Sequence, residues 1–344
     1  MKGRFLGLDI LRTIAIILVL VSHSNSILGF KDVLINKFLG SFGVEIFFIL
    51  SGYLICKIII ENDDTSINLI QKTKIFYLKR FLRIVPKYYI SIFIFFLANM
   101  YGRGSINLFA DGNLIPYFSF SQNLFCADPM IFPVAWSLSV EIWFYTLIPI
   151  VIYLFKPTIR LFLWIIVVLT VLKAFLFYGF YEKVNLFTTV ITRIDSIFFG
   201  GLLFISRTKS DLKKLNNYIL LIVTTLFIAL CYLNLNQILI NHNVNYIFLF
   251  KSIHFLLLDF GIAMLFTFFL KIKHKNFLNK IFKFTADISY SLYLYHFAIL
   301  IQINHHLGNG VYAYKRFWLY SVVFSIVMYF SIEKPINYLK NKIK

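Results

Sequence analysis

Long apolar runs recur along this sequence, and each is long enough to cross a membrane as a helix, which takes roughly 20 apolar residues. Of the 344 residues, 60% are hydrophobic and only 14% are charged, far from the composition of a soluble globular domain. In lipid, only helices and closed barrels satisfy every backbone hydrogen bond. The pattern therefore predicts an all-α polytopic membrane protein with about ten transmembrane helices. We expect them at residues 8–28, 40–60, 84–101, 138–155, 159–180, 186–206, 217–236, 246–270, 284–303 and 312–332.

Basic residues concentrate in alternate connections between these spans. The cluster Lys79-Arg80-Phe81-Leu82-Arg83 precedes the third span, whereas the connection after it carries only Arg103. Because Lys and Arg are enriched in cytoplasmic loops, both termini are predicted to be cytoplasmic. The formal net charge of +19 does not indicate nucleic acid, since the basic residues fall between spans rather than on one polar face. No linker divides the chain, so we expect a single membrane domain over residues 1–344 with no appended soluble domain.

Ionisable residues inside predicted spans indicate a site, because a charge in the bilayer is costly unless it faces a cavity or a partner. Arg12 and His23 share the first span, within about 40° of one helix face and about 16 Å apart in depth. Glu45 of the second span lies at the outer depth of His23, and a histidine–carboxylate pair suits a general base. We predict that these three residues are catalytic. Alternatively, Arg12 extends to lipid headgroups, His23 marks the interface and Glu45 forms a structural ion pair.

Arg80 and Arg83 lie at the predicted cytoplasmic entrance of the third span. Their spacing of three residues puts them on one helix face. Two forked guanidinium groups suit a phosphate-bearing ligand from the cytosol, such as a coenzyme A donor. Anionic lipid headgroups are the alternative partner.

Further polar residues are expected near the depth of His23 and Glu45, in one polar outer chamber. We interpret them as acceptor-side or structural groups, and Glu141 alternatively as a carboxylate at a helix N-terminus beside an aromatic belt. They are Trp136, Ser139 and Glu141 at the fourth span, Arg193 and Asp195 in the sixth, and His296 in the ninth. The loop 102–137, with Asp111, Gln122, Asn123 and Asp128, is predicted to face the acceptor.

Several of these residues stand in motifs that resemble acyltransferase family 3. The motifs are Arg-x10-His at 12 and 23, FGVEIFFILSGYLI at 42–55, RFLR at 80–83, WSLSVE at 136–141, SYSLYLYH at 289–296 and IEKP at 332–335. The family often has Asp at the position of Glu45, and the longer side chain of Glu45 keeps the charge but shifts its reach by about one methylene.

The resemblance implies a bacterial inner-membrane O-acyltransferase of surface polysaccharides. It implies that an acyl group, usually acetyl from acetyl-CoA, passes from the cytoplasm to a sugar hydroxyl of a glycan or lipid-linked glycan outside. In that scheme Arg80 and Arg83 hold the CoA phosphates, Arg12 steadies the donor and His23 acts on the hydroxyl; no metal is expected. The competing hypothesis is a transporter or flippase for a lipid-linked sugar, although the sequence has no inverted repeat.

Overall fold

The computed structural model describes residues 4–30, 33–61, 68–103, 114–125, 131–180, 185, 187–209, 217–240, 244–272 and 278–343. Within these ranges every regular element is a helix, which confirms the all-α prediction. The elements are α1 (Leu6–Ser24), the 3-10 helix η1 (Asn25–Leu28), α2 (Val33–Glu61), α3 (Leu69–Arg103), α4 (Ile115–Phe118), α5 (Ala135–Leu154), α6 (Ile159–Phe180), α7 (Val190–Lys209), α8 (Asn217–Ile240), α9 (Val244–Phe269), α10 (Leu278–His306), α11 (Val311–Met328), the π-helix η3 (Tyr329–Glu333) and α12 (Lys334–Lys342).

Each predicted span coincides with a long helix, but not all of these helices are equally apolar. Six candidate spans among the described residues are long and apolar enough to cross a membrane: Leu6–Leu28, Leu34–Glu61, Leu69–Tyr101, Ala135–Leu154, Ile159–Leu176 and Val311–Lys342. In α8 and α9 the described side chains give the apolar stretches Ile222–Asn234 and His254–Phe269, and α7 and α10 are more polar. The protein is therefore a membrane protein, while the count of about ten spans and the cytoplasmic termini stay predictions.

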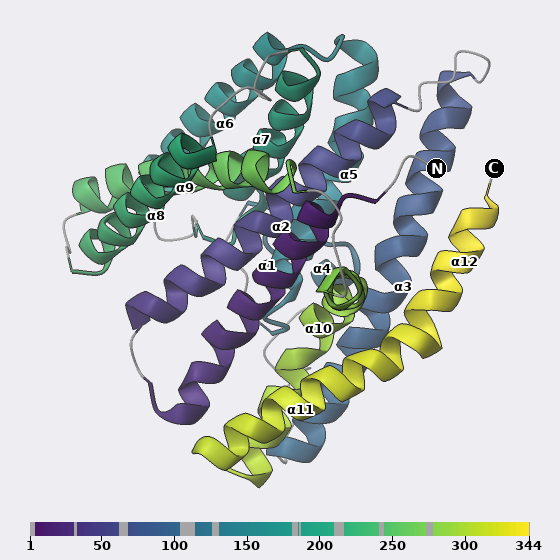
Figure 1. Ribbon diagram of the computed structural model, residues 1–344, viewed down its shortest axis with the longest axis vertical. Coiled ribbons are helices and arrows are strands. Elements are labelled where there is room, and N and C mark those ends of the chain that lie inside the picture. The colour runs from purple at the N-terminus through teal and green to yellow at the C-terminus, as the bar shows by residue number, and fades with distance from the viewer. Residues whose placement is uncertain are drawn as a thin grey trace.

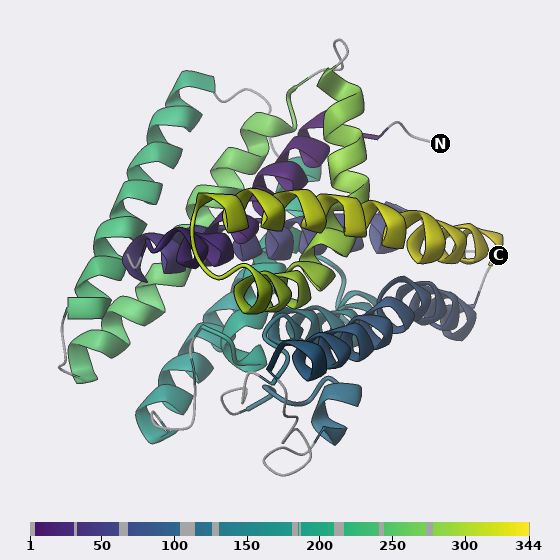
Figure 2. The same cartoon turned by 90° about the horizontal axis from the view of Figure 1, so that it is seen from below.

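The helices form a bundle around α1 and α2, which lie side by side at its centre (Figure 1). On one flank are α6, α7, α8 and α9, and on the other are α3, α11 and α12, with α10 between α1 and α3. Figure 2 shows α11, η3 and α12 as one continuous rod that runs beside α3. Since Pro335 has no backbone N–H, it interrupts the regular helical hydrogen bonding just after the π-turn of η3.

The outer face of α6 is apolar and uncovered. Trp164 and Phe175 are each 68% exposed, and Val168 is also exposed. A large apolar surface of this kind indicates contact with lipid or with another protein. On this helix the surface agrees with a transmembrane position.

Two glycines determine how α2 and α7 cross. A methyl group on Gly52 would collide with the carbonyl oxygen of Ile197, and one on Gly200 would collide with that of Ile49. Small residues allow membrane helices to approach this closely. Glu45 lies seven residues before Gly52 on α2, and Arg193 lies seven residues before Gly200 on α7. Because the two helices run in the same direction, their contact at the glycines also brings Glu45 and Arg193 together.

Candidate active site

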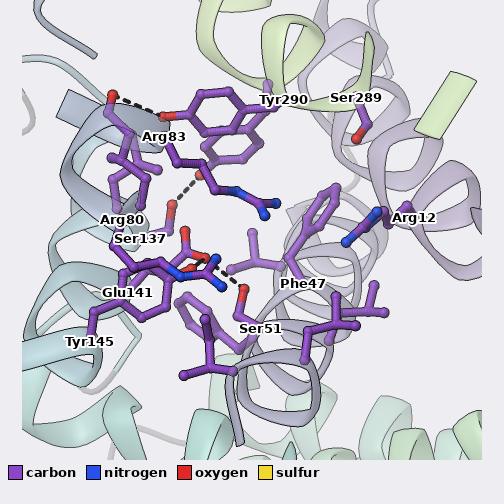
Figure 3. Close-up of a pocket in the computed structure, with 18 residues that line it drawn as sticks. Arg12, Phe47, Ser51, Arg80, Arg83, Ser137, Glu141, Tyr145, Ser289 and Tyr290 are labelled. Atoms are coloured by element: carbon purple, nitrogen blue, oxygen red, sulfur yellow. Dashed lines mark hydrogen bonds between the residues drawn. The ribbon is translucent and has the colours of Figure 1, made fainter. Parts of the chain in front are cut away.

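Two cavities lie inside the bundle, and the first contains the arginines that the sequence analysis selected. This arginine cavity has an empty volume of about 810 Å³, including space open to solvent, and is lined from α1, α2, α3, α5 and α10. Figure 3 shows the guanidinium groups of Arg12, Arg80 and Arg83 pointing into it. The structure therefore brings Arg12 of α1 together with the arginine pair of α3.

The arginine cavity carries excess positive charge. Glu141 is the acidic residue in its lining, and it accepts hydrogen bonds from Ser51 Oγ at 2.7 Å and from the Tyr145 hydroxyl. Arg80 lies over the rings of Phe76 and Tyr145, 5.6 and 5.5 Å from their centroids. Within the described part of the chain, none of the three arginines forms an ion pair with a carboxylate. Because buried charge without a counterion is costly, the cavity suits a ligand with several negative charges.

Beside this cavity, a buried ion pair joins α3 to the π-helix η3. Lys87 Nζ lies 3.3 Å from Glu333 Oε1, and Ser291 Oγ donates to Glu333 Oε2 at 2.8 Å. Lys87 also lies over the ring of Tyr290, which lines the arginine cavity. Since Arg83 and Lys87 are four residues apart on one helix face, this pair holds the face that presents Arg83. The sequence analysis missed Lys87, although a lysine inside an apolar run was a usable signal.

The second cavity contains His23 and is called the histidine cavity here. Its empty volume is about 1170 Å³, including open space, and its lining includes Glu45, Trp136 and Arg193. Polar residues from several segments complete it, namely Ser22, Asn36, Lys37, Ser41, Asn185 and Thr188. Such a mixture of hydrogen-bonding groups with an aromatic ring suits a polar ligand that has an apolar face.

His23 is paired with His296 of α10. His23 Nδ1 lies 3.0 Å from His296 Nε2, and His296 Nδ1 lies 3.1 and 2.9 Å from the carbonyl oxygens of Leu292 and Tyr293. Because carbonyl oxygens only accept, the proton of neutral His296 belongs on Nδ1, and its Nε2 accepts from Nδ1–H of His23. This assignment leaves a lone pair on Nε2 of His23. A neutral imidazole in that tautomer is suited to act as a general base.

The predicted contact between His23 and Glu45 is wrong, although both side chains line the histidine cavity. Glu45 forms a buried ion pair with Arg193, and the guanidinium group of Arg193 lies 3.4 Å from the centroid of the Phe255 ring. A full positive charge is a stronger partner for a buried carboxylate than a neutral imidazole is. The glycine crossing of α2 and α7 brings this charge to Glu45.

Asp195 belongs to a separate buried network and is absent from the lining of both cavities. Its carboxylate lies 2.6 Å from Lys173 Nζ of α6, and both side chains are 0% exposed. Next to it, Ser196 Oγ donates to Asp259 of α9 at 2.9 Å. The sequence analysis missed Lys173 and Asp259, which are charged residues inside predicted spans. This network ties α6, α7 and α9 together.

The residues of WSLSVE have different partners. Trp136 lines the histidine cavity, Glu141 lines the arginine cavity, and Ser139 is buried and accepts from Gln122 Nε2 at 2.6 Å. The expectation of one outer chamber is therefore wrong, because Glu141 is with the arginines. Gln122 and Asn123 are buried and hold their loop against neighbouring segments, so they do not form an open surface. The predicted acceptor-facing residues Asp111 and Asp128 lie outside the described residues.

Val44 and Tyr293 line both cavities. The arginine and histidine cavities therefore adjoin each other inside the bundle. Among the described residues, no group of three or more His, Cys, Asp or Glu side chains is placed to hold a metal ion. The arrangement offers an anion site next to a site with a histidine base.

Comparison with known proteins agrees with the motifs. The model of acyltransferase family 3, an acyltransferase domain, matches residues 5–332. A "Putative O-acetyltransferase" of Staphylococcus aureus strain COL is 27% identical over 365 aligned residues, covering 97% of this chain and 58% of that protein. "O-acetyltransferase OatA" of Staphylococcus aureus strain NCTC 8325 is 26% identical, covering 96% of this chain and 57% of that protein. This chain thus spans less than two thirds of the length of the relatives it matches. No solved structure matches it.

The family match covers the elements that build both cavities, from Arg12 and His23 in α1 to Tyr293 in α10. The chain therefore belongs to acyltransferase family 3.

Proposed function

We propose that the chain is an O-acyltransferase that moves an acetyl group from acetyl-CoA in the arginine cavity to a sugar hydroxyl in the histidine cavity. The observation that carries the proposal is the adjacency of an anion site and a site with a histidine base, which share Val44 and Tyr293. The names of the relatives, as O-acetyltransferases, favour acetyl as the acyl group. A transporter for a lipid-linked sugar needs no such base.

The donor binds by its phosphates. Coenzyme A carries several negative charges, and Arg80 and Arg83 form a guanidinium pair with no carboxylate partner in the described structure. Each guanidinium can donate two parallel hydrogen bonds to a phosphate, which gives strength and orientation. Arg12 enters the same cavity from α1 and binds the donor nearer to the reacting carbonyl.

The reaction is a direct transfer with His23 as the general base. The lone pair on Nε2 of His23 takes the proton of the acceptor hydroxyl while the hydroxyl oxygen attacks the thioester carbonyl carbon. The new C–O bond forms, the C–S bond breaks, and the electron pair leaves with the CoA thiolate. His296 accepts the hydrogen bond from Nδ1–H of His23 and keeps that imidazole in the required tautomer. Glu45 acts through Arg193, since their ion pair shapes the wall of the histidine cavity.

The acceptor is a glycan or lipid-linked glycan outside the cytoplasm, and the chain works in the bacterial inner membrane. This placement is supported by the positive-inside rule, which predicts that the basic connections and the entrance with Arg80 and Arg83 are cytoplasmic, where acyl-CoA is found. Trp136 with the polar lining of the histidine cavity suits a sugar ring, which has an apolar face and hydroxyl edges.

The test is transfer of radiolabelled acetyl from acetyl-CoA to envelope glycans by membranes that contain the chain. We expect His23→Ala to lower transfer by roughly 10²- to 10⁴-fold, the usual contribution of a general base. The matched control is His305→Ala, since His305 is exposed at the end of α10. Equal labelling with the wild type, with His23→Ala and with empty membranes would refute the proposal.

The donor site is tested separately by the double variant Arg80→Ala/Arg83→Ala. We expect a higher KM for acetyl-CoA, with transfer recovering at high donor concentration. Arg316→Ala is the control, because Arg316 of α11 lies outside the lining of both cavities and contacts Tyr312 and Tyr320. An unchanged KM in the double variant would place the donor elsewhere.

A further inference from the structure

We propose that Val44 and Tyr293 form the passage between the two cavities, and that Val44 limits the length of the acyl group that is transferred. This inference rests on the proposed function and goes beyond it, because it assigns donor selectivity to one side chain. Of all the residues that line either cavity, these two line both. Val44 comes from α2 and Tyr293 from α10, so the passage is bounded by two different helices.

Tyr293 is held in place from three directions. Its hydroxyl is hydrogen-bonded to Ser137 Oγ of α5 and lies 3.4 Å from the carbonyl oxygen of Val134. Its ring packs edge-on against Phe47, with centroids 6.1 Å apart. The ring of Tyr293 also lies 6.0 Å from the ring of His296, centroid to centroid. Moving this ring aside would therefore break contacts on α2, α5 and α10.

Val44 is held by the packing of its neighbour. A methyl group on Gly43 would lie 2.7 Å from the carbonyl oxygen of Ala15 and 2.9 Å from Val19 Cγ2, so α2 is already in close contact with α1 there. Val44 itself is 7% exposed. Because the backbone cannot be pushed toward α1, the width of the passage at this point depends on the size of the side chain at position 44.

The chemistry places the acyl tail against these residues. Phosphates held by Arg80 and Arg83 put the body of the donor in the arginine cavity, and a hydroxyl activated by His23 is in the histidine cavity. The thioester carbonyl carbon must then lie between them for the attack. The hydrocarbon tail on that carbon contacts Val44, whose side chain has no hydrogen-bonding group. A tail longer than acetyl needs space that the two methyl groups of Val44 occupy.

The experiment compares radiolabelled acetyl-CoA and butyryl-CoA as donors for the envelope glycans of membranes that contain the full chain. In an apolar pocket, one methylene is worth roughly 10- to 200-fold in selectivity. We expect Val44→Ala to raise the ratio of butyryl to acetyl transfer by about 10-fold or more. The matched control is Val190→Ala, because Val190 is also buried and lines neither cavity. Its ratio should stay within about twofold of the wild-type ratio.

The outcomes separate this inference from the proposed function. Acetyl transfer by wild type and Val44→Ala with the same ratio of butyryl to acetyl transfer would overturn the passage and leave the function standing. A wild-type chain that transfers no acyl group of either length would overturn both. Where Val44→Ala does not fold, Val44→Ile supplies the opposite test: propionyl transfer should fall at least several-fold relative to acetyl transfer, and an unchanged ratio would overturn the passage.

Discussion

Replacing His296 tests the link between tautomer and catalysis. His296→Phe keeps an aromatic ring but removes the nitrogen that accepts from Nδ1–H of His23. A buried donor left without an acceptor costs about 1–3 kcal/mol. At 1.4 kcal/mol per tenfold, the competent arrangement of His23 becomes roughly 5- to 150-fold less populated. We therefore expect kcat to fall by that factor, which is near or below the lower end of the loss expected for His23→Ala.

The assay is steady-state transfer of acetyl from acetyl-CoA by purified protein in lipid, with kcat and KM determined separately. His296 is absent from the lining of the arginine cavity, so KM for acetyl-CoA should stay near the wild-type value. His296→Gln is the rescue variant, since its amide oxygen can accept from Nδ1–H of His23. It should retain activity to within several-fold of the wild type.

Two results would refute this reasoning. Equal kcat for His296→Phe and the wild type would mean that His296 does not set the state of His23. Equal losses in His296→Phe and His296→Gln, with both variants folded, would mean that His296 acts through packing rather than through its acceptor nitrogen. Size-exclusion chromatography in detergent separates these results from simple misfolding.

Three further predictions concern binding and stability. Arg83→Ala should raise KM for acetyl-CoA by roughly 10- to 150-fold and leave kcat little changed. This factor corresponds to the loss of a charge-assisted hydrogen bond worth about 1.5–3 kcal/mol. A fall in kcat alone would contradict the role of Arg83 in donor binding. Lys173→Met should lower the free energy of unfolding by about 3–5 kcal/mol because the buried Asp195 loses its partner, and Lys173→Met/Asp195→Leu should recover most of it. Thermal unfolding in detergent measures both, and equal midpoints for the single and double variants would contradict the pairing. Gly52→Val should lower the yield and unfolding temperature of the protein, since its side chain would collide with the carbonyl oxygen of Ile197, and a wild-type unfolding temperature would contradict the close crossing of α2 and α7.

Much of the fold could be predicted because lipid leaves few options to an apolar chain. Each apolar run had to become a helix, and each coincides with one in the described structure. The arginine cavity was also partly predictable. Arg80 and Arg83 share a helix face by their spacing alone, and the motif resemblance connected them with Arg12.

The partners of the buried charges could not be predicted from depth alone. Glu45 was expected beside His23 because both lie at one level, but the partner of a helical residue also depends on how neighbouring helices are rotated and how closely they pack. That information lies in Gly52 and Gly200, whose contact brings Arg193 to Glu45. The place of Glu141 could not be predicted for the same reason. It depends on how α5 packs against α2, which carries the hydrogen-bond partner Ser51.

The motif SYSLYLYH on α10 connects the two cavities physically. Ser289 and Tyr290 line the arginine cavity, Tyr293 lines both, and His296 contacts His23. Ser289 and Tyr290 lie four and three residues before Tyr293, and His296 lies three residues after it, so these side chains follow one broad face of the helix over about 10 Å. One rigid helix, α10, thus carries both a wall of the arginine cavity and the hydrogen-bond partner of His23. A change in the rotation of α10 would therefore move the cavity wall, the passage and the partner of His23 together.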